Sequence, residues 1–340
     1  MQPTINIFNH SQLLMAGEYG TAQDLVIKSP VLVVGIGGAG SRIAKQAGAA
    51  IGCECLLVSN DKRDLGDDRS IFVNTGAWIN PSGPKLRSFL VAKSHQVNSA
   101  FEGYNTIIVV SNLAGKSGAA MAPLLCNAAR QSATVISFAI MPFGFEKDRI
   151  FNAGVSLRRV RETSHATIVM DNDAFLDNNP ELSREACYPL TNSAIVEVTS
   201  SIASKGVEPD MNILCTSKPQ EDSEKSLRDA VSMLYQDVAD TVAIKRAVVY
   251  VMGGESLSLG ALNQLVNNAR GVFKEEGTTE VSMSSTAAGA GDGVRVHLVA
   301  SAPQKTRFDA YDPLGMIADE LDWDEPDSAP EIELAIPVLE

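Results

Sequence analysis

The sequence is poor in the residues that hold transition metals or build disulfide frameworks. It contains five cysteines and four histidines among 340 residues. No two cysteines form a C-x-x-C pair, and the histidines (His10, His95, His165 and His297) have no metal-ligand spacing. We therefore expect reduced thiols in a cytoplasmic protein and no zinc or iron site, so that no residue is assigned to a metal.

Long hydrophobic runs and a basic patch are also missing. No apolar stretch is long enough to span a bilayer, and the N-terminus has no basic start followed by an apolar segment. The net charge is -13, but residues 308–340 hold 11 carboxylates and no lysine or arginine, which leaves -2 for residues 1–307. These features argue against direct membrane insertion and against nucleic acid as a partner, and they predict an acidic flexible tail.

What the sequence does contain is a regular alternation of apolar, β-rich runs and helix-like stretches. The expected strands are 31–36, 56–59, 71–74, 106–111, 134–141 and 166–170, and the expected helices are 42–50, 85–101, 119–131 and 148–163. This order predicts an α/β fold with a doubly wound, mostly parallel sheet. Ligands of such sheets bind beyond the carboxyl ends of the strands.

The second half of the chain has a different pattern. Apolar residues recur at helical spacing over 191–204, which predicts a central helix that joins two domains. Expected strands at 212–216, 246–252, 279–284 and 294–300, with helices at 224–241 and 259–274, form a smaller α+β unit. We expect an N-terminal extension (1–30), a nucleotide-binding domain (31–190), the linking helix (191–205), a C-terminal α+β domain (206–307) and the tail (308–340), where the aromatic residues of 308–311 suit packing on the body.

A glycine-rich turn follows the first expected strand. It consists of Gly35, Ile36, Gly37, Gly38, Ala39, Gly40 and Ser41. Glycine lets the backbone approach a ligand closely, and N–H groups at a helix start attract anions. Asp61 stands 21 residues beyond Gly40 and suits the carboxylate that holds a ribose in a dinucleotide site. The turn therefore fits a phosphate ligand such as NAD, and it also fits a tight strand-to-helix turn without a ligand.

A second glycine-rich turn, residues 113–119, follows the expected strand at 106–111. A Walker A loop would need a glycine where Val110 stands, so that interpretation is disfavoured. Lys116 offers a cation and Ser117 a hydroxyl to a phosphate, whereas the simpler alternative is a helix start capped by Ser117. Two such turns after parallel strands suggest a nucleotide held from both sides.

Several loops, in order over roughly residues 30–302, resemble those of the tubulin/FtsZ family, and the FtsZ branch most closely. These are 35–42, 58–61, Gly76-Ala77-Trp78-Ile79-Asn80-Pro81, 114–120, 142–146 with Arg149, Asn172-Asp173, and Asn192 in the linking helix. The binding residues that the resemblance implies are Gly35, Gly37, Gly38, Ala39, Gly40, Ser41, Arg42, Asn60, Asp61, Gly76, Ala77, Asn80, Pro81, Gly115, Lys116, Ser117, Gly118, Ala119, Ala120, Glu146, Arg149, Asn172 and Asn192.

The resemblance implies a function as well as a site. It implies that GTP or GDP is the ligand, with Mg²⁺ as a further candidate, and that subunits stack head to tail into filaments for cell division. The glycines of both turns would approach the phosphates, Glu146 would hold the ribose, Arg149 would offset charge and Asn192 would contact the base. A cytoplasmic protein, including a pool at the division site, is the corresponding location.

The chain departs from the family pattern in its phosphate loop. Lys116, Ala119 and Ala120 replace a glycine, a threonine and a glycine, and Arg42 replaces a common asparagine. A Cβ atom restricts the backbone and narrows the gap for phosphate oxygens. The charge of Lys116 would compensate by attracting phosphates, or it would hinder magnesium.

The catalytic loop departs as well. The family pattern has two carboxylates in a loop that enters the next subunit's nucleotide site, whereas Pro209 and Asn212 stand at those positions here. Glu208 and Asp210 are adjacent and could substitute, so the candidate catalytic residues are Glu208, Asp210 and Asn212. An amide orients water but cannot take its proton near neutral pH. We therefore expect GTP hydrolysis to be weak or to depend on a partner.

Two other interpretations and one further partner remain open. A non-hydrolysing paralogue that regulates or co-polymerises with an active relative would explain the altered loops. An NAD-dependent oxidoreductase would use residues 35–40 and Asp61, but would leave the loops at 76–81 and 115–118 without a role. The apolar end of the tail, residues 331–340, resembles a docking peptide for a membrane-tethering adaptor.

Overall fold

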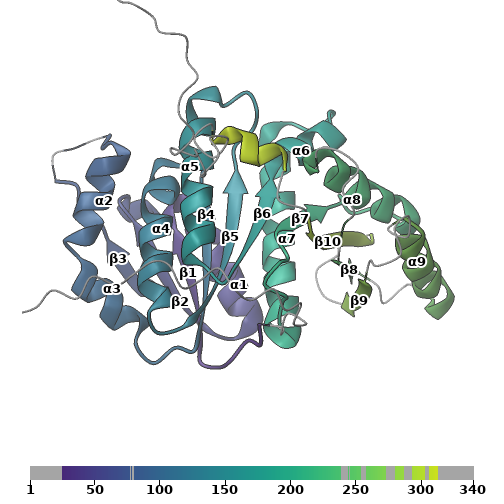
Figure 1. Cartoon of the computed structure of the whole chain (residues 1–340), viewed down its shortest axis with the longest axis horizontal. Helices are drawn as coiled ribbons and strands as arrows, with labels where there is room; N and C mark the ends of the chain where they lie inside the picture. Colours follow the sequence, from purple (N-terminus) through teal and green to yellow (C-terminus); the bar gives the residue numbers. More distant parts are fainter. Residues whose placement is uncertain are drawn as a thin grey trace, which may run out of the picture.

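A computed structural model describes residues 25–76, 78, 80–238, 244, 246–253, 258–272, 280–286, 293–302 and 306–312. Most of the expected N-terminal extension and of the acidic tail, including residues 331–340, lies outside the described residues. The described part has a central sheet with helices packed on its faces (Figure 1). None of its helices has the length and apolar character needed to cross a bilayer.

The strands of the described residues form one continuous ten-stranded sheet in the order β3-β2-β1-β4-β5-β6-β7-β10-β8-β9. Their bounds are β1 Val31–Ile36, β2 Glu54–Ser59, β3 Ser70–Phe72, β4 Thr106–Asn112, β5 Thr134–Met141, β6 Ala166–Asp171, β7 Ile213–Thr216, β8 Arg246–Met252, β9 Glu280–Thr286 and β10 Arg295–Ser301. Strands β1 to β7 pair in parallel, β10 is antiparallel to β7 and β8, and β8 and β9 are parallel. The predicted mostly parallel α/β sheet is confirmed.

Most helices of the described residues begin earlier than their composition indicated, whereas α9 begins at Leu259 as expected. Their bounds are α1 Gly37–Ile51, α2 Gly83–Val91, α3 Ser94–Phe101, α4 Lys116–Arg130, α5 Lys147–Thr163, α6 Asn172–Asn178, α7 Arg184–Lys205, α8 Ser223–Asp237 and α9 Leu259–Val272, with short 3-10 turns η1 Lys62–Asp64 and η4 Arg307–Tyr311. The single helix expected over 85–101 is interrupted because Lys93 has non-helical dihedral angles (φ -107, ψ 15). The linking helix starts at Arg184, seven residues before the expected position 191.

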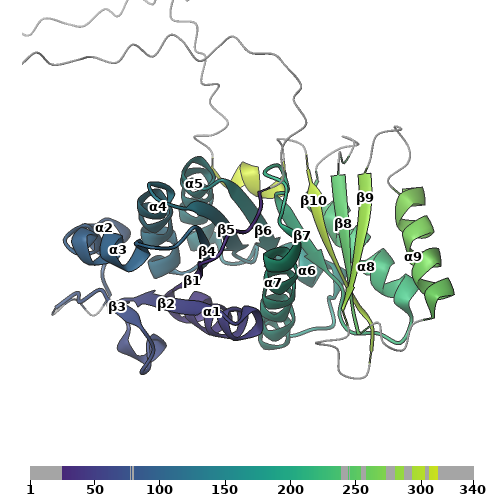
Figure 2. The same ribbon diagram turned by 90° about the horizontal axis from the view of Figure 1, so that it is seen from below.

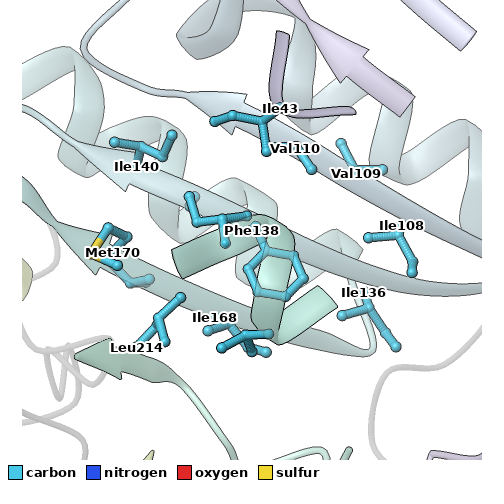
Figure 3. Close-up of a cluster of buried hydrophobic side chains, with 14 of the residues drawn as sticks. Ile43, Ile108, Val109, Val110, Ile136, Phe138, Ile140, Ile168, Met170 and Leu214 are labelled. Carbon is cyan, nitrogen blue, oxygen red and sulfur yellow. The ribbon is translucent and has the colours of Figure 1, made fainter. Parts of the chain in front are cut away.

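Both faces of the parallel sheet are covered. Helices α1 and α7 lie on one face, and α2, α3, α4 and α5 lie on the other (Figure 2). Strands β1, β5 and β6 are therefore buried almost throughout, as continuous apolar runs require. Ile136 and Phe138 of β5 pair with Ile108 of β4 and Ile168 of β6 in this core (Figure 3). The core fixes the height of each strand end, and so the position of the loops that follow.

The 3-10 turn η4 fastens the end of the described chain to the edge of the sheet. Phe308 is fully buried, so the expected packing of residues 308–311 on the body is confirmed. Arg307 reaches a cluster of aspartates: its Nε lies 3.5 Å from Asp171 Oδ2, its Nη1 donates to Asp177 at 2.9 Å, and its Nη2 donates to Asp173. These contacts hold the turn from β6 into α6 in place.

A second buried carboxyl group completes this cluster. Asp237 at the end of α8 and Asp171 are both fully buried, and neither oxygen of Asp237 has a hydrogen-bond donor among the described residues. Burial raises the pKa of both groups, and Asp171 raises the pKa of Asp237 further, whereas Arg307 and the contact with Asp237 oppose the rise at Asp171. Two carboxyl groups in this position can share one proton, which supplies the missing donor.

The two halves of the sheet meet at β6 and β7. One register pair, Val169 with Ile213, joins these strands in the described residues, and the Val169 N–H donates to the Asn212 carbonyl at 2.9 Å. Helix α7 is attached to the second half by buried polar contacts: His297 of β10 is 2.6 Å from Glu197 Oε2, and Arg295 donates to Ser193 at 2.6 Å. Burial lowers the pKa of His297.

Candidate functional site

The carboxyl ends of β1, β2 and β4 lie level with one another. Ile36, the last residue of β1, pairs with Val58 on one side and with Ser111 on the other. The segments that follow these strands therefore emerge side by side at one edge of the sheet. They contain both glycine-rich turns and the loop with Asn60 and Asp61.

Each glycine-rich turn forms the first turn of a helix. Gly35 lies near the end of β1. The rest of the turn after Ile36 belongs to α1, namely Gly37, Gly38, Ala39, Gly40, Ser41 and Arg42. In the same way Gly115 is the N-cap of α4, which contains Lys116, Ser117, Gly118, Ala119 and Ala120. Neither helix has a side-chain cap or an acidic residue in its first turn. Free N–H groups at two helix starts form a strong attraction for an anion.

Close packing brings these two helix starts together. Gly37 has a φ of +67, and a Cβ on it would lie 3.2 Å from the Ser117 Cβ. A Cβ on Gly118 would lie 2.0 Å from the Asn112 carbonyl oxygen, so α4 starts in direct contact with the end of β4. We call residues 37–41 and 115–119 the cradle. Its two backbone segments face each other as the sequence predicted.

Two asparagine side chains connect the cradle to the neighbouring loops. Ser117 Oγ donates to Asn60 Oδ1 at 2.5 Å, and Lys116 Nζ donates to Asn80 Oδ1 at 2.7 Å. Asn80 belongs to the 76–81 loop, in which Gly76 has a φ of +61 and Pro81 is buried. Ala77 lies outside the described residues. Four of the predicted loops therefore converge on one place.

A cleft of about 900 Å³ opens beside the cradle, between α2, α4 and α5. Its lining includes Asn80, Arg87, Lys116, Asp148 and Arg149. Three cations therefore face one carboxylate in this cleft. This charge balance suits a polyanion more than a neutral ligand.

Hydrogen bonds within the loop at 142–146 and to Arg149 hold the loop that is predicted to contact the ribose. Glu146 Oε2 accepts the Phe143 N–H at 3.2 Å, and its Oε1 accepts Arg149 Nη1 at 2.9 Å. The Gly144 N–H donates to Asp173 Oδ1 at 2.8 Å, which joins this loop to the Asn172-Asp173 turn. The loop is thus held rigidly at the edge that carries the cradle.

The remaining predicted binding residues differ in exposure. Asn172 is buried and donates to the Met141 carbonyl at 3.2 Å. Asn192 is half-buried on α7, the helix that packs against α1, and it makes no side-chain hydrogen bond to any described residue. Arg42 is exposed. Their roles toward a nucleotide stay predictions.

Asp61 is already neutralised by a neighbour. Arg63 contacts both of its carboxylate oxygens, at 2.6 Å for the shortest bond, and these hydrogen bonds lower the pKa of Asp61 to about 2. Asp64, which the sequence analysis missed, accepts Ser59 Oγ at 2.6 Å and lies against Gly38. In an NAD site the Asp61 carboxylate would bind a ribose, and in this structure it is bound by the exposed Arg63.

The candidate catalytic residues lie at the amino ends of the parallel strands, opposite the cradle. The 206–212 loop precedes β7, and its residues Pro209, Asp210 and Asn212 line one cleft together with Ala166 and Thr167 at the start of β6. Glu208 forms an ion pair with Arg246, and Asp210 accepts Ser301 Oγ at 3.0 Å. Asp210 also lines a cleft of about 420 Å³, together with Arg161 and His165. One subunit therefore cannot bring this loop to its own cradle.

Asn212 is part of the structure of the sheet. Its amide donates to the Ala302 carbonyl at 3.0 Å, and its Oδ1 accepts the Ala302 N–H at 2.9 Å. Both ends of the amide are thus used by the end of β10. Any catalytic work at this loop would fall to Glu208 and Asp210.

We expect Asn212→Asp to lower the free energy of unfolding by about 1 to 3 kcal/mol, because a carboxylate would face the Ala302 carbonyl and lose the donor. Urea unfolding followed by circular dichroism measures this change. Asn127→Asp, at an exposed position on α4, is the matched control and should change stability by less than about 0.5 kcal/mol. Equal stability of the two variants would contradict the structural role of Asn212.

Two observations about this site were beyond the sequence analysis. Asn112 shapes the second glycine-rich turn, because its Oδ1 accepts the Ala114 N–H at 2.8 Å and its carbonyl accepts the Gly115 N–H at 3.1 Å. An asparagine at a strand end, just before a glycine turn, is a recognisable signal. Arg87 lines the cleft from α2, and no local sequence pattern predicts its place there.

No group of three or more His, Cys, Asp or Glu side chains in the described part of the chain could hold a metal ion.

A family profile and several cell division proteins match this chain. The profile described as Tubulin/FtsZ family, GTPase domain, matches residues 76–180. Cell division protein FtsZ 1 of Pyrococcus horikoshii is 26% identical over 197 residues, which cover 54% of this chain and 52% of the relative. Cell division protein FtsZ of Haloferax mediterranei is 24% identical over 279 residues, 73% of this chain and 72% of the relative. The chain thus spans about half the length of the Pyrococcus relatives that it matches.

Solved structures share the fold. An FtsZ dimer from M. jannaschii superposes with a TM-score of 0.65 at 20% identity, over 82% of this chain and 89% of that chain. CetZ2 from Haloferax volcanii, solved as a GTPgS-bound protofilament, superposes with a TM-score of 0.61 at 19% identity, over 83% and 96% of the two chains. These likenesses extend over both halves of the ten-stranded sheet.

Proposed function

The chain belongs to the tubulin/FtsZ family, and on this premise we propose that it binds a guanine nucleotide in the cradle. The observation that carries this proposal is the pair of uncapped helix starts, α1 and α4, placed against each other at one sheet edge. The N–H groups of both would bind the phosphates. Lys116 would add charge, Glu146 would hold the ribose, and Asn192 would contact the base.

We further propose that subunits associate head to tail. The cradle lies at the carboxyl edge of the parallel strands and the 206–212 loop at the amino edge. A contact between unlike ends is heterologous, and it builds an open filament when the rotation between neighbouring subunits does not close a ring. The nucleotide of one subunit would then meet Asp210 of the next. The printed states of two solved relatives, a dimer and a protofilament, support this arrangement.

Hydrolysis in such a filament would be slow. Glu208 is held by Arg246, Asp210 lies 3.9 Å from the same guanidinium, and Asn212 is occupied by Ala302. Side chains that are held by these partners are less available to orient an attacking water. Association would serve cell division in the cytoplasm, and residues 331–340 would dock on a membrane-tethering adaptor.

The ligand can be identified by thermal unfolding with GTP, GDP, ATP and NAD in turn. We expect GTP and GDP to raise the melting temperature, because a ligand at 100 times its Kd stabilises the native state by about 2.7 kcal/mol. ATP and NAD should have little effect. Stabilisation by NAD alone would replace this proposal with the oxidoreductase interpretation.

Phosphate release by the pure protein, under conditions that form filaments, tests the catalytic proposal. We expect slow turnover that Asp210→Ala lowers further. A second candidate function is a non-hydrolysing paralogue, which the fully occupied amide of Asn212 favours; it predicts no turnover and few filaments without an active relative. Rapid cooperative turnover that Asp210→Ala abolishes would show that the loop is a competent catalyst.

A further inference from the structure

Lys116 stands where a lysine is unfavourable for folding. It is the first residue of α4, and the helix macrodipole places partial positive charge at that end. The first turn holds no acidic residue that would compensate, and the lysine side chain is exposed. A bound anion would stabilise the lysine cation at this position, and the cation would in turn strengthen the binding of the anion.

The same site is short of ligands for a divalent cation. Mg²⁺ in nucleotide sites is held by one or two carboxylates together with phosphate oxygens and water. The amide oxygens of Asn60 and Asn80 accept Ser117 Oγ and Lys116 Nζ, respectively. Asp61 is bound by Arg63 and Asp64 accepts Ser59 Oγ. Asp148 lines the same cleft but is outnumbered there by Lys116, Arg87 and Arg149, whose charge repels a divalent cation. The residues of this site therefore do not fit a protein-held magnesium ion.

The hydrogen bond between Lys116 and Asn80 positions the cation. It joins the start of α4 to the 76–81 loop across the mouth of the 900 Å³ cleft that both residues line. Arg87 and Arg149 line the same cleft. A lysine ammonium is a compact point charge with three donors, which suits a cluster of phosphate oxygens. Three cations thus line the cleft beside the cradle, in which the terminal phosphates would lie.

From these observations we propose that Lys116 takes the place of a divalent cation, so that the nucleotide binds with the same affinity with or without Mg²⁺. This inference rests on the proposed function, because it concerns the nucleotide of the cradle. It goes beyond that function in assigning the charge compensation to one side chain of this chain. Removing Lys116 should then create a requirement for Mg²⁺ that the natural protein lacks.

Isothermal titration calorimetry with GDP and with GTP, in buffer with MgCl₂ and in buffer with EDTA, tests the proposal. For the natural sequence we expect Kd values within about threefold of each other in the two buffers. For Lys116→Met we expect Kd in EDTA to rise about 10- to 100-fold, the range for a lost hydrogen bond to a charged group. Added Mg²⁺ should restore most of that loss.

Lys85→Met is the matched control. Lys85 is an exposed lysine of α2 whose Nζ lies 4.8 Å from the centre of the Trp78 ring, outside the cradle. Its removal should leave Kd unchanged in both buffers. A second variant, Lys116→Gly, restores the residue type of the family pattern and should behave like Lys116→Met.

The outcomes distinguish a failure of the proposed role of Lys116 from a failure of the proposed nucleotide site. Tight binding by the natural protein that weakens tenfold or more in EDTA would overturn the role of Lys116 and leave the nucleotide site intact. An unchanged Kd of Lys116→Met in EDTA would do the same. Absence of binding in both buffers would overturn the proposed function itself, and the inference with it.

Discussion

Gly118→Ala is expected to lower the free energy of unfolding by about 3 kcal/mol. Gly118 belongs to the first turn of α4, and a Cβ there would lie 2.0 Å from the oxygen and 2.8 Å from the carbon of the Asn112 carbonyl. That carbonyl cannot move freely, because Asn112 is paired with Ile140 in the middle of the sheet. The start of α4 would have to shift away from β4, and from Gly37.

The sign of this effect distinguishes it from ordinary helix propensity. Alanine usually stabilises a helix interior relative to glycine by about 0.5 to 1 kcal/mol. Gly271 in α9 is the matched control, because a Cβ on it would meet nothing within 4 Å. Gly271→Ala should therefore leave stability unchanged or raise it.

Urea unfolding of both variants, followed by circular dichroism, measures the difference. The Gly118→Ala protein should also lose affinity for the nucleotide, since one side of the cradle moves. A Gly118→Ala protein as stable as the Gly271→Ala protein would show that α4 does not start in contact with β4.

Arg307→Met is expected to destabilise the protein by about 3 to 5 kcal/mol at pH 8, the cost of removing one partner from a buried ionic cluster. Arg307 compensates Asp171, Asp173 and Asp177, and through them the buried Asp237. Arg184→Met is the control, because its ion pair with Glu185 joins two exposed side chains. An exposed pair of this kind contributes at most about 1 kcal/mol.

The destabilisation should shrink as the pH falls. Burial raises the pKa of Asp171 and Asp237 in the folded protein, and because Arg307 lowers both, its loss would raise both further. Between the unfolded pKa and the raised folded pKa, the folded state binds more protons, so its stability falls as the pH rises. The variant should therefore approach the natural protein near pH 4 and diverge from it toward pH 8. Urea midpoints of both proteins across this range would show the trend, and a constant difference would contradict it.

The parallel half of the fold was predictable because its strands are buried on both faces. The run at 134–141 coincides with β5, since a fully buried strand needs unbroken apolar and β-branched residues. Helix starts were less predictable. Glycines in 37–40 read as a loop, but a glycine tolerates the first helical turn when tertiary contacts fix it.

The loops of the site could be found one by one, but not their connections. Ser117 and Asn60 are 57 residues apart, and Lys116 and Asn80 are 36 apart. The engagement of Asn212 by Ala302 spans 90 residues, so no local pattern shows that this amide is unavailable to water. Residues close in the sequence determine the local backbone structure. Contacts between residues far apart in the sequence determine which side chains remain available for a ligand.

The boundary between β6 and β7 has the fewest paired residues of any two neighbouring strands in the described sheet. One register pair crosses that boundary, whereas seven pairs join β4 to β5, so a bend of the sheet breaks the fewest backbone contacts there. The Asp171–Asp173 turn ends β6 on one side, and the 206–212 loop begins β7 on the other. A small rotation about this line would turn the two ends of the subunit relative to each other while leaving both hydrophobic halves intact. Curvature along a chain of such subunits would then be set at this single joint.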